Sequence, residues 1–299
     1  MMNRKERQSG RVPNSNEIVS YSAQAASLSR YYNPLKMVRS LWRYRELIWQ
    51  FTRREIEGRY KGSFLGILWS VGPPLILLLT YTFVFGIIFK SRWHNAKSNN
   101  LAEFALVMFC GLMAYNFFSE CVSRAPSIIV QVPNYVKKVV FPLEILPLVR
   151  LFSALINAVF SLGVLFVGIL IFNHFIHWTA LLLPLIWLPM MMFTLGCGYF
   201  LASLGVFVRD MGTIIGVLTT ILFFLTPIFY PISAVPEPFR FFCRINPIAL
   251  FVEDARRVVL WGLSPDWPWF FFGMALSGAV LIFGFVWFMK SKKAFADVI

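Results

Sequence analysis

Residues 151 to 208 contain no Asp, Glu, Lys or Arg, and this uncharged run constrains the fold more than any other stretch of the sequence. An α-helix rises about 1.5 Å per residue, so about 20 apolar residues cross the ~30 Å hydrocarbon core of a bilayer. The run is therefore long enough for two membrane spans joined by a turn at 173–178. Residues 62 to 89 form a second uncharged run, which predicts another span with length to spare.

The composition also indicates an integral membrane protein. Of the 299 residues, 58% are hydrophobic and 14% are charged, against roughly 25% charged residues in soluble domains. The net charge of +14 comes from Arg and Lys in the tails and short loops, which favours contacts with anionic lipids and disfavours nucleic acid. The four cysteines show no CxxC pairing, and His174 and His177 have no acidic or thiol neighbours, so no metal site is expected.

We predict an all-α integral membrane protein with a transmembrane domain at 62–289. Its six transmembrane helices are expected at about 63–89, 101–123, 146–172, 179–207, 211–230 and 267–289. Residues 1–33 are polar and have no apolar core, which indicates a disordered cytoplasmic tail rather than a signal peptide. Residues 290–299 are expected to form a second cytoplasmic tail.

Residues 34–61 predict an amphipathic helix that lies in the membrane interface. One stripe is polar, and it consists of Arg43, Glu46, Gln50, Arg53, Glu57 and Lys61. The opposite face is apolar, and it consists of Leu41, Tyr44, Leu47, Ile48 and Phe51. The alternative is a basic stop signal with no further role. Glu55 and Arg59 fall on the apolar face, where they are expected either to pair or to contact a partner subunit or the substrate.

Two segments between the predicted spans have short helices of their own. Residues 124–142 read as a loop with a short helix between spans two and three, and Glu120 is spaced to pair with Arg124 at its start. Residues 231–264 are too polar to span and too apolar for an exposed loop. Two amphipathic pieces, 238–245 and 248–260, fit a re-entrant or interface-lying helical pair there.

The distribution of positive charge sets the orientation. With six spans, both termini lie on one side, together with the loops at 124–142 and 209–210. That side has thirteen Arg and Lys before the first span and seven more after it, against seven on the other side. The excess predicts that both termini are cytoplasmic.

Catalytic motifs are missing from the sequence. It has no GxxxxGK[ST] phosphate loop, HExxH or GxSxG. The ionisable residues Glu103, Glu120, Glu144 and Arg150 sit near span ends, which disfavours a proton-coupled transporter. We therefore expect no catalytic residue, metal or cofactor in this chain.

Aromatic residues are dense in predicted spans one, two and five. Their rings would stack on sugars if they faced a common pore, and packing in lipid or in the core is the alternative. The channel candidates are Tyr81, Phe85, Tyr115, Phe118, Phe224 and Tyr230.

Five stretches resemble a known family, the membrane permeases of ABC exporters for lipid-linked polysaccharides such as O-antigen, capsule and teichoic acid. The stretches are REIEGRYKGSFLGILWSVGPPL at 54–75, VPNYVKKVVFPLEILP at 132–147, GVFVRDMG at 205–212, FLTPIFYPISAVPE at 224–237 and INPIALFVEDARRVVLWG at 245–262. Together they touch nearly all of the chain beyond residue 40.

The resemblance implies a homodimeric channel with two copies of a separate nucleotide-binding subunit, which would bind ATP and Mg. The segment at 126–138 would be the coupling helix, and the interfacial helix would be a gate beside a lipid-exposed entry. Expected contacts with the ATPase are Asn134, Tyr135, Lys137, Lys138, Arg209, Asp210 and Glu55. The periplasmic gate segment 231–264 would include Pro231, Pro236, Asn246, Glu253, Arg256 and Arg257.

Basic residues of the interfacial helix would meet the anionic headgroup of a lipid-linked glycan through charge-assisted hydrogen bonds. The candidates for headgroup recruitment are Arg53, Arg54, Arg59 and Lys61. Anchoring to phospholipid is the alternative role. Two other functions stay open: an ABC exporter of the same architecture with a drug, haem or lipid as cargo, and a membrane-embedded transferase acting on polyprenol-linked sugars.

Overall fold

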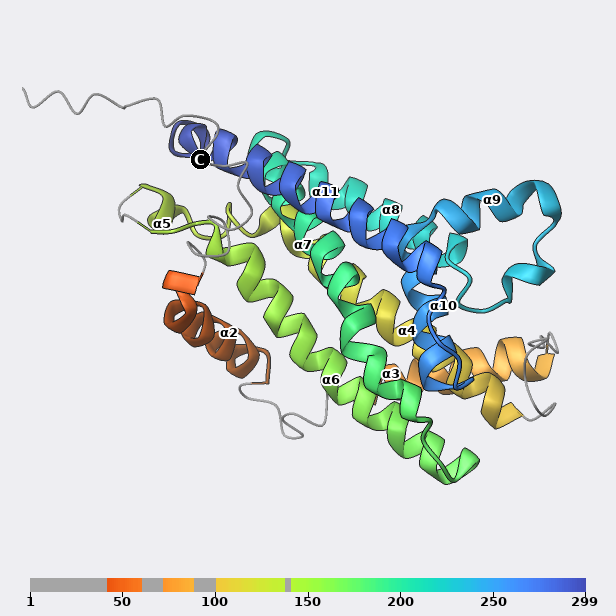
Figure 1. Cartoon of the computed structure of the whole chain (residues 1–299). Coiled ribbons are helices and arrows are strands. Elements are labelled where there is room, and N and C mark those ends of the chain that lie inside the picture. The colour runs from red at the N-terminus through yellow and green to blue at the C-terminus, as the bar shows by residue number, and fades with distance from the viewer. Residues whose placement is uncertain (1–41, 61–71, 89–100, 138–140) are drawn as a thin grey trace, which may run out of the picture.

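The computed structural model describes residues 42–60, 72–88, 101–137 and 141–299 (Figure 1). Within these residues every regular element is a helix, which confirms the predicted all-α class. The predicted tail at 1–33, the start of the first span, Lys61 and Lys138 lie outside the described residues.

Four helices are long and apolar enough to cross a membrane. They are α4 (Leu101–Arg124), α6 (Ile145–Asn173), α7 (Leu183–Phe207) and α11 (Trp267–Ser291). Shorter apolar helices are α3 (Gly72–Tyr81), which continues as a π-helix at Thr82–Ile88, and α8 (Met211–Leu225). These helices overlap the six predicted spans, and the count of six membrane crossings stays a prediction.

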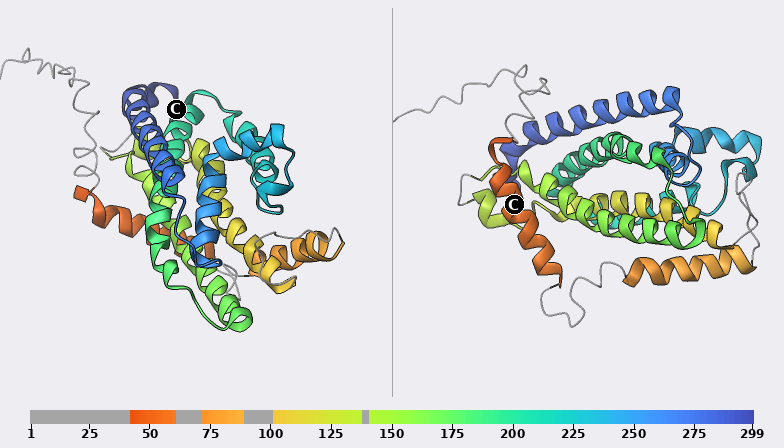
Figure 2. Two further views of the ribbon diagram at one scale, coloured as in Figure 1. Left: turned by 45° about the vertical axis from the view of Figure 1, so that its right-hand side comes forward. Right: turned by 60° about the horizontal axis from the view of Figure 1, so that its bottom comes forward.

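Glycine allows α7 and α11 to pack closely along their length (Figures 1 and 2). A Cβ atom added at Gly196 of α7 would lie 2.6 Å from the backbone carbonyl of Val280 in α11. Real Cβ atoms do not approach backbone that closely, so any side chain at this position would force the two helices apart. Small residues are a common means of close helix packing in membranes, where lipid offers no hydrophobic driving force.

The helix α2 (Arg45–Tyr60) lies on the outside of the bundle (Figure 2, right). Its buried Ile48 packs against Ile145 and Val149 in the first turns of α6. Its opposite side remains exposed and carries Arg53 and Arg54, with the side chain of Arg53 70% accessible. An apolar face on the bundle and an exposed basic face are typical of an interfacial helix.

Two short helices follow α8, as the prolines in that segment predict. They are α9 (Glu237–Ile245) and α10 (Pro247–Val259), and the side chain of Asn246 caps α10 by accepting from the amide of Ile248 at 3.0 Å. α10 packs into the bundle against α4, α7 and α11, whereas α9 projects from the end opposite α5 (Figure 1).

The C-terminal segment, predicted as a cytoplasmic tail at 290–299, is packed against the bundle. Phe295, at the start of α12 (Phe295–Val298), is fully buried against Phe288 and Phe207. The ammonium of Lys292 donates to the Glu144 carboxylate at 2.6 Å, at the beginning of α6. This end of α11 is therefore fixed to α6 and α7.

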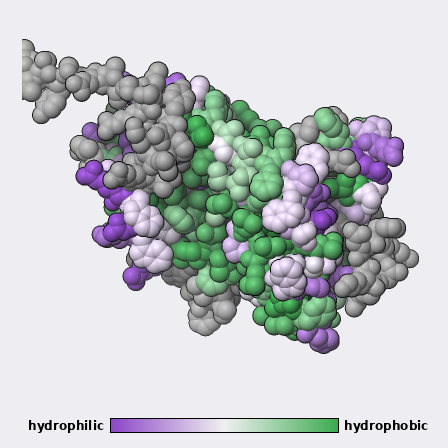
Figure 3. All heavy atoms as spheres, viewed as in Figure 1, coloured by the Kyte–Doolittle hydropathy of each residue, from purple (hydrophilic) through white to green (hydrophobic). Residues whose placement is uncertain are grey.

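The surface pattern fits a protein surrounded by lipid along its middle. Figure 3 shows a broad hydrophobic face over the bundle, with hydrophilic residues gathered near α2 and near α9. Large apolar side chains such as Leu79, Ile171 and Phe271 are 60–70% exposed. Soluble monomers rarely expose so continuous an apolar surface to water.

Candidate functional site

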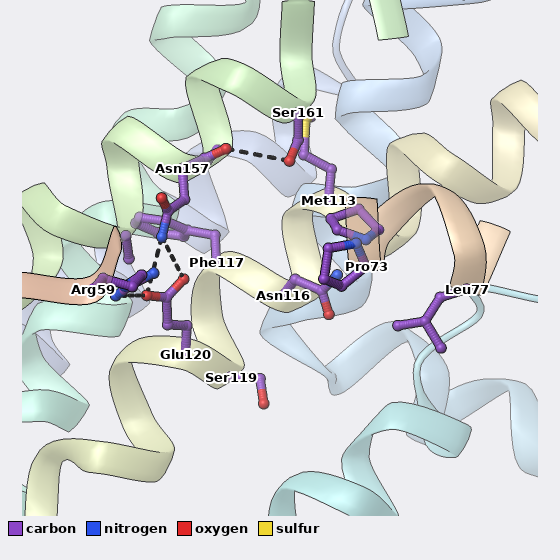
Figure 4. Close-up of a pocket in the computed structure, with 13 residues that line it drawn as sticks. Arg59, Pro73, Leu77, Met113, Asn116, Phe117, Ser119, Glu120, Asn157 and Ser161 are labelled. Carbon is purple, nitrogen blue, oxygen red and sulfur yellow. Dashed lines mark hydrogen bonds and ion pairs between the residues drawn. The ribbon is translucent and has the colours of Figure 1, made fainter. Parts of the chain in front are cut away.

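A cavity of about 550 Å³ opens between α3, α4 and α6, next to the last turn of α2 (Figure 4). Its apolar wall includes Pro73 and Leu77 of α3 and Phe117 of α4. Its polar wall is unusual for apolar helices, because it brings together Arg59, Asn116, Ser119, Glu120, Asn157 and Ser161. A mostly apolar cavity with a few convergent polar groups is typical of a ligand site.

The carboxylate of Glu120 is the centre of the polar wall (Figure 4). Its Oε1 accepts from Nη2 of Arg59 at 2.5 Å, which joins α2 to α4. The Asn157 amide on α6 donates to both oxygens of Glu120, at 3.2 Å each. Three helices therefore meet at one carboxylate.

Arg150 of α6 lies behind this carboxylate, with only 8% of its side chain exposed. Its Nη1 donates to the carboxylate of Glu55 on α2. Its Nη2 lies 4.0 Å from Oε1 of Glu120, beyond hydrogen-bonding distance. Among the described residues nothing accepts a hydrogen bond from Nε or Nη2 of Arg150. The two arginines and two glutamates balance in charge, as burial of ions requires.

This network differs from the pairs that the helical spacing suggests. Glu55 pairs with Arg150 instead of Arg59, and Glu120 pairs with Arg59 instead of Arg124. Both partners come from elements far apart in the sequence, at separations of 95 and 61 residues. Asn157 was not singled out, although an amide in the middle of an uncharged apolar helix is a usable signal.

The predicted headgroup residues lie in two environments. Arg59 reaches the cavity, whereas Arg53 forms an exposed pair with Glu57 at 2.6 Å and Arg54 is exposed on the outer face of α2. Exposed pairs of this kind contribute little to stability and leave both groups available to lipid.

The predicted coupling residues lie mainly in α5 (Pro133–Lys137) and at the turn between α7 and α8. Asn134, Lys137, Arg209 and Asp210 are exposed. Tyr135 is half-buried instead, since its ring stacks on Phe141 with centroids 4.6 Å apart and also meets Phe51 of α2 edge-on. α5 is thus braced against the interfacial helix.

The aromatic candidates form packed ring clusters. Phe85 stacks on Phe229 at 4.6 Å, and Phe223 connects Tyr81, Tyr115 and Phe229 at 5.0–6.0 Å. Tyr115 and Phe118 are each only 4% exposed, so the core-packing alternative describes them better than a pore does. Of the six candidates, Phe224 is the most exposed, at 58%, and the hydroxyl of Tyr230 donates to its carbonyl at 2.9 Å.

Arg256 is the most deeply buried of the predicted gate residues, with no exposed surface. It donates to the carbonyls of Val107, Pro227 and Ile228 at 3.1, 2.7 and 3.0 Å, and Glu253 lies 3.6 Å away. It therefore ties α10 to α4 and to the turn after α8.

The remaining gate residues lie in turns or form hydrogen bonds that fix loop conformations. Asn246 donates to Thr226 at 3.0 Å, and Nε of Arg257 donates to the carbonyl of Ser264 at 2.9 Å. Pro231 begins the turn into α9 and Pro236 immediately precedes it.

The carboxyl of Asp254 faces a small cavity between α9, α10 and α11. It accepts from the amide of Asp266 at 3.0 Å. Burial raises the pKa of this carboxyl to about 6. Among the described residues, no group of three His, Cys, Asp or Glu side chains is placed to hold a metal ion.

The sequence of this chain is similar to those of known membrane transport proteins. The family model for the ABC-2 type transporter matches residues 46–260. The O-antigen export system permease protein RfbA of Myxococcus xanthus is 29% identical over 234 residues, or 78% of this chain and 87% of that protein. An O-antigen export system permease protein RfbA of Klebsiella pneumoniae is 25% identical over 270 residues, or 89% of this chain and 99% of that protein. The family match covers most of the chain and all of the network around Glu120, and the chain therefore belongs to the ABC-2 type transporter family.

Proposed function

We propose that this chain is the membrane subunit of an ABC transporter that exports a lipid-linked, O-antigen-like polysaccharide. The observation that carries the proposal is end-to-end similarity to O-antigen export permeases, which extends over 99% of the Klebsiella pneumoniae relative. The cavity at Glu120 supports it, because an exporter of this kind must admit a polar headgroup into an apolar bundle.

In this proposal α3 and α8 cross the membrane with the four long helices, making six spans. Both termini then lie in the cytoplasm with α5 and the turn at Arg209, and α9 lies on the periplasmic side of the inner membrane. The excess of Arg and Lys on the end with the termini supports this orientation.

The cargo enters beside α2. Its headgroup carries phosphate, and Arg53, Arg54, Arg59 and Lys61 attract it by charge-assisted hydrogen bonds. Of these, Arg59 reaches the cavity between α3, α4 and α6, where Asn116 and Ser119 offer further polar contacts. The glycan follows through a channel that two copies of the chain form, with α10 and the Arg256 contacts holding the periplasmic gate.

Energy comes from two copies of a separate ATPase chain that binds ATP and Mg. Its docking surface consists of exposed residues on α5 and at the α7–α8 turn, namely Asn134, Lys137, Arg209 and Asp210. Lys138, which lies outside the described residues, is assigned to the same surface from its place in the sequence. The contact between Tyr135 and Phe51 supports a route from that surface to α2, because motion of α5 presses directly on the interfacial helix.

Purification of the tagged full chain from its native host in mild detergent tests the proposal. We expect a stoichiometric phosphate-loop ATPase to co-elute, identified by mass spectrometry, and the complex to hydrolyse ATP. A chain that elutes without any ATPase, in several detergents and in nanodiscs, would contradict the proposal.

A further inference from the structure

We propose that Glu120 is an exchangeable ligand: the phosphate of a lipid-linked cargo takes its place on Arg59, and Glu120 moves onto Arg150. The inference rests on the proposed function for the source of the phosphate. It adds a defined anion site, at Nη2 of Arg59, and a switch that cargo binding operates.

The position of Arg59 fits a phosphate ligand. Its side chain is 25% exposed, and both it and Glu120 line the 550 Å³ cavity rather than a sealed interior. Guanidinium N–H groups donate to carboxylate and phosphate oxygens alike, so a phosphate oxygen can take the place of Oε1 of Glu120 on Nη2 of Arg59. Ser153, 3.5 Å from Nη2 of Arg59, remains beside the exchanged anion.

Arg150 gives the displaced carboxylate a second partner. Its Nη2 is 4.0 Å from the same Oε1 that Arg59 now contacts, and no described residue accepts from this nitrogen or from Nε. Buried donors without acceptors are costly, so a short movement of Glu120 toward Arg150 recovers free energy as the Arg59 contact is lost. Asn157, which donates to both carboxylate oxygens, can follow this movement without releasing Glu120.

Each carboxylate keeps an arginine partner in the exchange. Before it, Glu120 pairs with Arg59 and Glu55 pairs with Arg150. After it, the phosphate pairs with Arg59, and Arg150 holds both carboxylates. The additional negative charge lies at the open side of the site, where solvent and the basic face of α2 screen it.

The consequence concerns α2. Arg59 is the residue of its last turn that bonds to α4, whereas Glu55 and Ile48 hold the helix to α6. Exchange therefore detaches the end of α2 from α4 and leaves the helix hinged on α6. Binding of cargo and movement of the interfacial helix become one event.

Binding to the purified full chain in nanodiscs tests the exchange, with undecaprenyl diphosphate and phosphatidylglycerol as separate probes. If Glu120 competes with phosphate for Arg59, Glu120→Gln should bind undecaprenyl diphosphate more tightly than wild type, by about threefold to tenfold, whereas Arg59→Gln should weaken binding by about tenfold or more. Glu46→Gln, which removes the exposed pair with Arg45 on the same helix, is the matched control and should leave the affinities for both probes unchanged. Unchanged or weaker binding by Glu120→Gln would overturn the proposal.

Hydrogen exchange in the wild-type chain gives a test that requires no variant. Saturating undecaprenyl diphosphate should accelerate amide exchange in residues 52–60, opposite to the protection that ligands usually confer. Slower exchange there would refute the release of α2.

The two probes separate this inference from the proposed function. Tight binding of undecaprenyl diphosphate that Glu120→Gln does not strengthen would be consistent with the proposed exporter function and would rule out the exchange. The full set of effects with phosphatidylglycerol alone would keep the exchange and count against a lipid-linked glycan as cargo.

Discussion

Replacing Arg256 with methionine removes a fully buried cation that three backbone carbonyls surround, at 2.7–3.1 Å. Methionine fills a similar volume, so the loss of stability in this variant measures the polar contacts of Arg256. The substitution would remove a hydrogen-bond donor from three carbonyls, those of Val107, Pro227 and Ile228. Glu253 would also lose its buried counter-ion at 3.6 Å. Breaking a buried pair costs about 3–5 kcal/mol, and the effects on the carbonyls overlap with that figure rather than add to it.

Thermal unfolding in detergent, followed by fluorescence-detected size exclusion, measures this loss. We expect the midpoint to fall by roughly 10 °C. The neighbouring Arg257→Met is the control, because its guanidinium bonds to the exposed carbonyl of Ser264, and it should cost only about 0–1 kcal/mol. Equal losses for the two variants, or an Arg256→Met midpoint like that of wild type, would refute the role of Arg256 as the tie between α10 and α4.

Three further predictions concern helix packing, pH and coupling. Gly196→Ala should destabilise the chain by about 1–3 kcal/mol, because the added Cβ would meet the α11 backbone. Gly163→Ala, where an added Cβ meets nothing within 4 Å, should stabilise the chain by about 0.5–1 kcal/mol. Identical melting curves for the two variants would contradict this. The Asp254 carboxyl binds its proton more tightly in the folded chain than in the unfolded chain, because burial raises its pKa from 3.8 to about 6, so its contribution to stability falls as the pH rises through that window. Asp254→Asn should therefore stabilise the fold by roughly 1–3 kcal/mol at pH 8 and little below pH 4, and a gain independent of pH would exclude this carboxyl as the cause. Tyr135→Phe keeps the stack on Phe141 and should preserve cargo-stimulated ATP hydrolysis. Tyr135→Ala should lower this stimulation by about threefold or more at normal expression. Equal stimulation in the two variants would show that the contact of Tyr135 with Phe141 is not needed for coupling.

Local features of the fold could be predicted because they depend on neighbouring residues. Prolines and amphipathic spacing placed helices at 238–245 and 248–260, and α9 and α10 lie within one residue of those bounds. Four long apolar runs likewise became helices of spanning length. Such signals depend only on residues that are close together in the sequence.

Tertiary partners could not be predicted in this way. Helical spacing offers Glu120 only partners on its own helix, such as Arg124, whereas the actual partner, Arg59, approaches from another element. The C-terminal tail illustrates the same limit. The burial of Phe295 depends on its contacts with Phe207 of α7 and Phe288 of α11, which no local pattern reveals.

Co-reconstitution of this chain with its ATPase partner in proteoliposomes tests the account most directly, with a fluorescently labelled undecaprenyl-diphosphate-linked glycan as cargo. The account predicts that ATP drives the glycan across the membrane and that the glycan stimulates hydrolysis. It also predicts that both effects are reduced in Arg59→Gln and preserved in Arg43→Gln, which alters an exposed position on the same amphipathic segment. An intact complex that hydrolyses ATP and moves no glycan, in wild type and variants alike, would contradict the assignment of this chain as a glycan exporter.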